Sequence, residues 1–213
     1  MYIIHIYSLI KMEKNINNIG SEKKDNDNKL GYKKLVNISK ELSYLLRHGA
    51  VKEKLNIDSK GFVLLDEVLE NKTVRKMKTS REMIYEVVKD NNKKRFEIQK
   101  INGKEYIRAV QGHTLTEVKN EEALEEIPNV YDYPTIIHGT YFEAWEFIKK
   151  TGLNRMSRNC IHFAIGDNND KNVISGMRGN VQLIVEIDAP LCVANGIKMY
   201  ISKNKVVLSD GVN

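Results

Sequence analysis

The sequence predicts an α+β protein with two lobes joined by an acidic linker. Two observations support this prediction. Helix and hairpin patterns fill residues 30–119, and short apolar strands dominate from Ile161 onward. The chain of 213 residues is long enough for two small lobes. We therefore divide it into a tail at 1–29, a first lobe at 30–119, a linker at 120–130 and a second lobe at 131–213.

Residues 1–29 are predicted to be a disordered tail. The segment EKNINNIGSEKKDNDNK has no aromatic residue and too few apolar side chains to order itself. The apolar opening MYIIHIYSLIK is about half as long as the ~20 residues that a membrane span needs. It also lacks a basic start and a small-residue cleavage site, as a secretory signal would require. We expect an intracellular protein, cytoplasmic or nuclear, without a membrane anchor.

The first lobe is predicted to hold three helices followed by a β-hairpin. The first helix ends at LLRHGA, where Gly49 is expected to take the left-handed position after the helix. A second helix is expected in LLDEVLEN, and a third begins with a capping box, Thr79 to Glu82. The segment RFEIQKINGKEYIRAV alternates on both sides of Asn102-Gly103, which is a strong hairpin signal. This order of elements is the layout of a winged-helix module, and many such modules bind nucleic acid.

The second lobe is predicted to be mostly sheet. The segment YPTIIHGTYFEAWEFIKKTGL gives a short strand, a turn and a helix that opens with a second capping box, Thr140 to Glu143. From Ile161 onward five short apolar strands are expected, in IHFAI, VQLIVEI, LCVA, IKMYI and KVVLS.

Charge and cysteine content limit the classes of partner. The net charge of +6 and the pI near 9.1 allow an anionic partner such as nucleic acid, although a solvated basic surface explains them equally well. The two cysteines, Cys160 and Cys192, form no CxxC pair, and no His/Cys spacing is typical of a metal site. We therefore expect no structural metal.

Several short stretches could carry chemistry, and each also has an ordinary structural explanation. Neither common glycine-rich phosphate loop is present. His138-Gly139-Thr140 precedes a helix whose free N–H groups could face a bound nucleotide, or it is a simple strand-to-helix turn. Arg47-His48 could act on a substrate, or could offset the negative end of its helix dipole.

The remaining candidates are basic residues near predicted strands. Folding the hairpin about its turn places Arg108 opposite Glu97, so a cross-strand ion pair is the alternative to a functional role. His113 could be exposed in a turn, Arg158 could be solvated, and His162 could be packed in a strand. Arginine binds phosphate with two parallel hydrogen bonds, and histidine transfers protons near neutral pH. Together these residues predict a protein that holds two phosphorylated substrates.

Seven motifs resemble the NAD-dependent RNA 2′-phosphotransferases when taken in order. They span residues 38–211 and read SKELSYLLRHGA, GFVLLDEVL, YIRAVQGHT, HGT, GLNRMSRNCIHFA, ISGMRGN and NGIKMYISKNKVVLSDG. The resemblance implies a winged-helix-like RNA-binding lobe at 30–119 and an NAD-binding, ADP-ribosyltransferase-like, mostly-β lobe at 131–213. It also implies transfer of an internal RNA 2′-phosphate, typically on tRNA at a splice junction, to NAD. The expected products are RNA with a 2′-hydroxyl, ADP-ribose 1″,2″-cyclic phosphate and nicotinamide, formed through an RNA-2′-phospho-ADP-ribose intermediate.

The resemblance also assigns roles to residues, with NAD as the co-substrate, no metal and a monomeric protein. The implied catalytic residues are Arg47, His48, Arg108 and Arg158. The implied NAD-binding residues are His138, Gly139, Thr140, His162, Ser175 and Arg178, and His113 is implied to contact RNA.

Three positions depart from the family pattern, and none is among the four implied catalytic residues. Cys160 replaces the first histidine of the RxHIHF motif, Ala50 replaces a proline and Thr114 replaces a serine. One alternative function is an ADP-ribosyltransferase that acts on nucleic acid ends or protein and would not need Arg47, His48 or Arg108. Another is a winged-helix binder without catalysis, which would not need the HGT motif.

Overall fold

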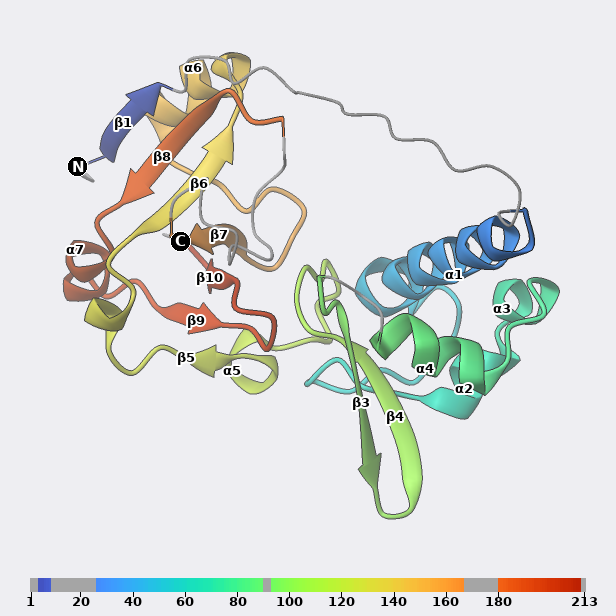
Figure 1. Ribbon diagram of the computed structural model, residues 1–213. Coiled ribbons are helices and arrows are strands. Elements are labelled where there is room, and N and C mark those ends of the chain that lie inside the picture. The colour runs from blue at the N-terminus through green and yellow to red at the C-terminus, as the bar shows by residue number, and fades with distance from the viewer. Residues whose placement is uncertain (1–3, 9–25, 90–92, 167–179, 212–213) are drawn as a thin grey trace.

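The computed structural model describes residues 4–8, 26–89, 93–166 and 180–211. Its helices and two separate sheets confirm the α+β prediction. One lobe carries most of the helices and a three-stranded sheet, and the other is built around a seven-stranded sheet (Figure 1). Among the described residues, no helix is both long enough and apolar enough to cross a membrane.

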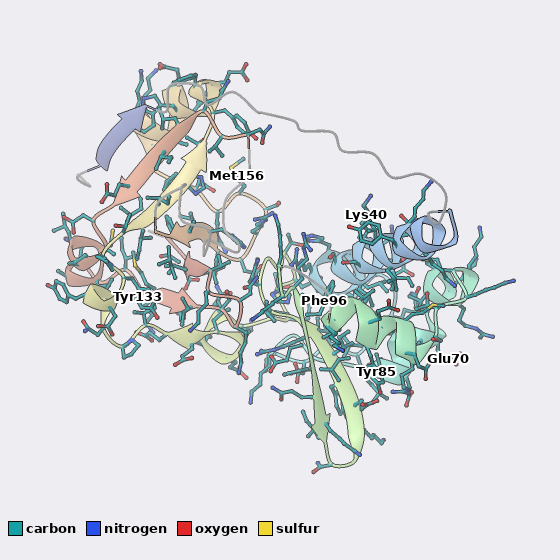
Figure 2. The ribbon with its side chains drawn as sticks, in the orientation of Figure 1. Lys40, Glu70, Tyr85, Phe96, Tyr133 and Met156 are labelled. Atoms are coloured by element: carbon teal, nitrogen blue, oxygen red, sulfur yellow. The ribbon has the colours of Figure 1, made fainter. Side chains whose placement is uncertain are left out.

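The helices of the first lobe enclose one apolar core. They are α1 (Asn26–Tyr44), a π-helical turn η1 (Leu45–Gly49), α2 (Leu65–Glu70), α3 (Lys72–Lys76) and α4 (Arg81–Lys89). Leu42, Leu45 and Leu46 are fully buried, as their helical spacing requires. They pack with Ile84 of α4 and with Phe96, which lies where the hairpin meets the helices (Figure 2).

The hairpin of the first lobe matches its prediction. Strands β3 (Phe96–Ile101) and β4 (Lys104–Ala109) pair in antiparallel register, and β2 (Val63–Leu64) adds a third strand beside β4. Asn102 and Gly103 both have positive φ, 50° and 80°, as a two-residue hairpin turn requires. The hairpin projects away from the helices (Figure 1).

The seven strands of the second lobe follow the order β1-β8-β6-β7-β10-β9-β5, and every pairing is antiparallel. The strands are β1 (Ile4–Ser8), β5 (Glu125–Glu126), β6 (Ile136–Thr140), β7 (Ile161–Ile165), β8 (Leu183–Ile187), β9 (Met199–Ile201) and β10 (Val207–Ser209). The helices are α5 (Asn120–Ala123), the 3-10 turn η2 (Val130–Asp132), α6 (Phe142–Thr151) and α7 (Ala189–Ala194). Ile136, Phe163 and Val207 lie in its main core, which is separate from that of the first lobe.

Two predicted segments differ in the structure. The tail predicted for residues 1–29 includes β1, which pairs with β8, and the first residues of α1, which begins at Asn26. The sequence IHIYS is rich in strand-forming residues, and its pairing covers an edge of the sheet that would otherwise expose unpaired backbone groups. The linker predicted for 120–130 is also not irregular, because it contains α5 and β5 and reaches the start of η2.

The strand predicted at LCVA is wrong, because these residues belong to helix α7. Asp188 starts the helix by accepting a hydrogen bond from the Leu191 amide, and Pro190 lies in the first turn, where its missing N–H costs nothing. A short apolar run fits a buried strand or a buried helix equally well, so its flanking residues decide.

Both predicted capping boxes are wrong in position. Helix α4 begins at Arg81, and the hydroxyl of Ser80, not that of Thr79, accepts from the Met83 amide. Thr140 is the buried last residue of β6 and does not cap α6. At α6 the side-chain oxygen of Gln182 accepts from the Phe142 amide, so the cap comes from a residue distant in sequence.

Candidate active site

Arg47 and His48 lie in the π-helical turn η1, which extends the end of α1. Turns of this kind are frequent at functional sites. Gly49 does not adopt the predicted left-handed conformation, and Ala50 after it remains in the right-handed helical region. A Cβ at position 49 would lie 2.7 Å from the ring of Tyr44, so a larger residue there would have to displace that exposed ring.

The Arg47 side chain carries two donor atoms that the described part of the protein does not use. Its Nε and Nη2 atoms are buried and have no hydrogen-bond partner among the described residues. Burial, together with the nearby positive charges of Arg95 and Arg158, lowers the pKa of Arg47 to about 10. Buried donors without partners are costly and rare in proteins, and a missing ligand is one explanation for them.

His48 is held in one orientation by a neighbouring hydroxyl. Its Nδ1 lies 3.0 Å from Oγ1 of Thr114, and the Thr114 hydroxyl in turn donates to the carbonyl oxygen of Arg47 over 3.4 Å. In the arrangement where the hydroxyl donates to that carbonyl, Nδ1–H of His48 donates to Oγ1 of Thr114 and Nε2 is unprotonated. Burial lowers the pKa of His48, and the charges of Arg47 and Arg158 add to this effect. The threonine that replaces the family's serine retains the hydroxyl that this contact uses.

His113 is buried, in contrast to the exposed turn that its sequence position suggested. Burial lowers its pKa to about 3, with contributions from the charges of Arg47, Arg108, His48 and His162, so the ring is neutral. Its Nε2 has no partner among the described residues. The neutral imidazole of His113 therefore lies below the surface, close to the charged residues of the site.

His162 and His138 lie on the adjacent strands β7 and β6 of the second lobe. His162 reaches the first lobe, because its Nε2 lies 2.9 Å from the side-chain amide of Gln111, while its Nδ1–H donates to the Cys160 carbonyl. Burial lowers its pKa to about 4, helped by the charge of Arg158. His138 donates from Nδ1 to the carbonyl of His162 over 2.9 Å and packs edge-on against Phe163.

The HGT motif forms the end of β6 and is not a strand-to-helix turn. Gly139 and Thr140 pair with Ile184 and Leu183 of β8, and α6 begins two residues later. The predicted NAD-binding residues Ser175 and Arg178 lie outside the described residues.

Of the four residues expected to be catalytic, three lie near one another and the fourth, Arg108, is bound by partners inside the protein. Arg158, from the second lobe, lies close enough to Arg47 and His48 to lower the pKa of each. The Arg108 guanidinium instead binds partners inside the protein. It pairs with Glu97 at 2.8 Å, donates to the carbonyls of Lys60 and Ala123, and lies 4.7 Å from the ring centroid of Phe62. The cross-strand ion pair considered for Arg108 is thus confirmed.

Three residues near the site were missed by the sequence analysis. Arg95 lies near Arg47 and lowers its pKa, Gln111 binds His162, and Asn159 bonds to the first lobe. The basic run KKR before β3 could have indicated Arg95. Gln111 and Asn159 gave no local signal, because their partners are distant in sequence.

A pocket of about 380 Å³ lies in the second lobe. Phe163, the ring that contacts His138, contributes to its wall. Its other lining residues come mainly from the end of α6 and the segment after it, and from α7 and the residues beside it; they include Gly152, Leu153, Asn154, Asp188 and Leu191. The mixture of apolar walls and a few polar groups is typical of a site for a small organic molecule. Among the described residues, no group of three or more His, Cys, Asp or Glu side chains could hold a metal ion.

Comparison with known proteins connects this arrangement to one family. The model of the RNA 2′-phosphotransferase, Tpt1 / KptA family matches residues 33–211. A Danio rerio protein, tRNA 2′-phosphotransferase 1, is 40% identical over 179 residues, which are 83% of this chain and 78% of that protein. A Saccharomyces cerevisiae tRNA 2′-phosphotransferase is 39% identical over 186 residues, 84% of this chain and 80% of its own. A relative from Schizosaccharomyces pombe is 40% identical over 179 residues, and the chain spans 48% of its length.

Proposed function

Because the chain belongs to the RNA 2′-phosphotransferase, Tpt1 / KptA family, we propose that it transfers an internal RNA 2′-phosphate to NAD. The names of its relatives support tRNA as the RNA that carries this phosphate. The proposed first step is attack of the 2′-phosphate on the nicotinamide ribose, which expels nicotinamide. In the second step the ribose 2″-hydroxyl attacks phosphorus and releases the RNA 2′-hydroxyl. The other product is ADP-ribose 1″,2″-cyclic phosphate.

The unpartnered buried donors of Arg47 are the observation that best supports this proposal. A phosphate placed against them would satisfy both donors at once, in the bidentate geometry that arginine favours. Arg158 approaches the same point from the other lobe and supplies more positive charge. Such charge offsets the repulsion between the anionic substrates and stabilises the charge that develops in the transesterification step.

His48 is proposed to take the proton from the ribose 2″-hydroxyl in the second step. Its lowered pKa keeps the ring neutral at physiological pH, and its contact with Thr114 leaves Nε2 as the proton acceptor. The first step needs no such base, because the phosphate is already anionic and nicotinamide is a good leaving group.

The second lobe is proposed to bind NAD in the manner of ADP-ribosyltransferases. His138, Gly139, Thr140 and His162 are its expected contacts, together with Ser175 and Arg178. The pocket beside Phe163 is the place that we propose for part of the dinucleotide, since its volume suits a nucleobase and the ring of Phe163 contacts His138. The first lobe is proposed to bind RNA as a winged-helix-like module, with His113 and Arg108 supporting the site from beneath.

Product analysis tests the proposed function. We expect the protein, mixed with NAD and an RNA that carries one internal 2′-phosphate, to yield RNA with a free 2′-hydroxyl. The reaction is expected to continue in EDTA, because arginine side chains supply the proposed charge stabilisation, and to stop without NAD. A strict magnesium requirement would contradict the proposed mechanism. A product that remains RNA joined to ADP-ribose would show an ADP-ribosyltransferase that stops after the first step.

The pH dependence of the second step gives a separate prediction. Because the pKa of His48 is lowered, the rate should be independent of pH near neutrality and should fall only as the pH drops below the ordinary histidine value of about 6.5. In Arg158→Ala, NMR titration of His48 should show a higher pKa than in the wild type, since a neighbouring positive charge is removed. The His48→Gln spectrum identifies the resonance. An unchanged pKa in Arg158→Ala would contradict the proximity of the two side chains.

A further inference from the structure

We propose that Asn159 is a positioning residue that holds Arg158 in the reacting site by fastening its loop to the first lobe. This inference rests on the proposed function, because it assigns Asn159 a role through a residue that is proposed to be catalytic. Asn159 lies directly after Arg158 and two residues before β7 begins.

The hydrogen bonds of Asn159 join the two lobes. Its backbone N–H donates to the carbonyl of His113 over 2.8 Å. Its side-chain amide donates to the carbonyls of Leu115 and Val118, at 2.9 and 3.1 Å. Its own carbonyl accepts from the side chain of Asn120 over 3.3 Å. Each of these partners lies between residues 113 and 120, the segment that leaves the first lobe.

A second set of hydrogen bonds, to the Asp210 carboxylate, holds the residues around Asn159 from within the second lobe. The amide of Asn120 also donates to the Asp210 carboxylate, over 2.5 Å, and the Cys160 thiol donates to that carboxylate over 3.6 Å. Asn159 and the following Cys160 are therefore held, although the segment from Asn154 to Cys160 forms no helix or strand. Within that segment Met156 has a positive φ of 58° and an exposed side chain (Figure 2). The hydrogen bonds of Asn159 therefore contribute to the position of Arg158, together with the bond from the Arg158 amide to the Arg155 carbonyl.

The chemistry of these contacts requires an amide at position 159. Both side-chain hydrogens donate to backbone carbonyls, which are acceptors only. An aspartate would place a carboxylate against the same two oxygens, and an alanine would leave them without this donor. A shift of about 1 Å at a reacting group can lower a rate roughly 100-fold. We therefore expect Asn159 to affect the chemical step and not the binding of either substrate.

The test combines Asn159→Ala with Arg158→Ala in a double-mutant cycle. Turnover is measured with NAD and 2′-phosphorylated RNA, and thermal unfolding is measured for each variant. Asn159→Ala is expected to lower kcat about 10–100-fold, with KM for both substrates nearly unchanged. In the Arg158→Ala background the same change should have little further effect, because the residue that it positions is absent. Asn129→Ala, which removes an exposed amide contact with Asp132, is the matched control. If Asn159→Ala does not fold, Asn159→Ser replaces it.

The outcomes separate this inference from the proposed function. The inference is overturned if Asn159→Ala behaves like Asn129→Ala, or if it lowers kcat equally in both backgrounds. If the wild-type protein does not convert the RNA, the proposed function fails and the role of Asn159 fails with it. If the wild type converts the RNA and Arg158→Ala keeps the wild-type rate, the proposed function stands and the roles of Arg158 and Asn159 fail. A loss of kcat that is confined to the background containing Arg158 supports the inference.

Discussion

Replacing Arg47 with methionine is expected to lower the rate of 2′-phosphate transfer by about 10²–10³-fold while leaving the protein as stable as before, or more stable. The loss of rate follows from removing a preorganised donor at the phosphate. The retained stability follows from the two Arg47 donors that are buried without a partner, because their removal breaks no described hydrogen bond and relieves the cost of desolvating them.

Single-turnover kinetics and chemical denaturation measure the two effects of Arg47→Met separately. Arg47→Lys is the informative companion, since it retains the positive charge and loses the planar fork. We expect it to build up RNA joined to ADP-ribose, visible as a slower band on a denaturing gel that forms only with NAD. A large loss of stability in Arg47→Met would show that its guanidinium has structural partners.

Replacing Arg108 with methionine is expected to have the opposite effect to Arg47→Met: its main result is a loss of stability and not a direct loss of rate. It would remove the closer ion-pair partner of Glu97, which would keep only Lys203 at 3.9 Å and the Gln99 amide, and it would leave the carbonyls of Lys60 and Ala123 without this donor. Removing one partner of a buried ion pair typically destabilises a protein by about 3–5 kcal/mol. The Arg108 side chain is only 8% exposed and that of Glu97 20%, so solvent screens the pair weakly.

Arg75→Met is the matched control for Arg108, because its ion pair with Glu70 is largely exposed. That change should alter the free energy of unfolding by less than about 1 kcal/mol. Denaturant titration gives the free energies, and activity is measured where both variants are folded. If Arg108→Met is fully stable and yet inactive, the catalytic role implied by the family resemblance is the correct one and the structural role is not.

The architecture could be predicted from the sequence wherever local patterns are strong. The leucines of α1, the Asn102-Gly103 turn and the alternation in β3 and β4 each specify their element within a few residues. Helix α7 was missed because a four-residue apolar run has no readable period. Strand β1 was missed because its partner β8 lies about 180 residues away, as the pairing of Ile4 with Ile187 shows.

In the site too, residues in local motifs could be predicted, while contacts between distant segments could not. The motif residues Arg47, His48, Arg158 and His162 were singled out in the sequence, and the structure brings them together from two lobes. Gln111 and Asn159 carry no local pattern, since the carbonyls and rings that they bind come from other segments. The environment of Arg108 was left open between two explanations, and only the folded hairpin shows its ion pair with Glu97.

The two apolar cores are separate, and this affects how the site assembles. Each lobe encloses its own core, while the side chains that we propose to be catalytic come from both. The chain that connects the lobes therefore keeps the site residues of one lobe near those of the other. For a short connection the resulting effective concentration is in the millimolar range. In a protein cut between Asn120 and Val130, the two halves would have to find each other by diffusion. Activity would then depend on protein concentration, as it does for the fragments of a split reporter enzyme.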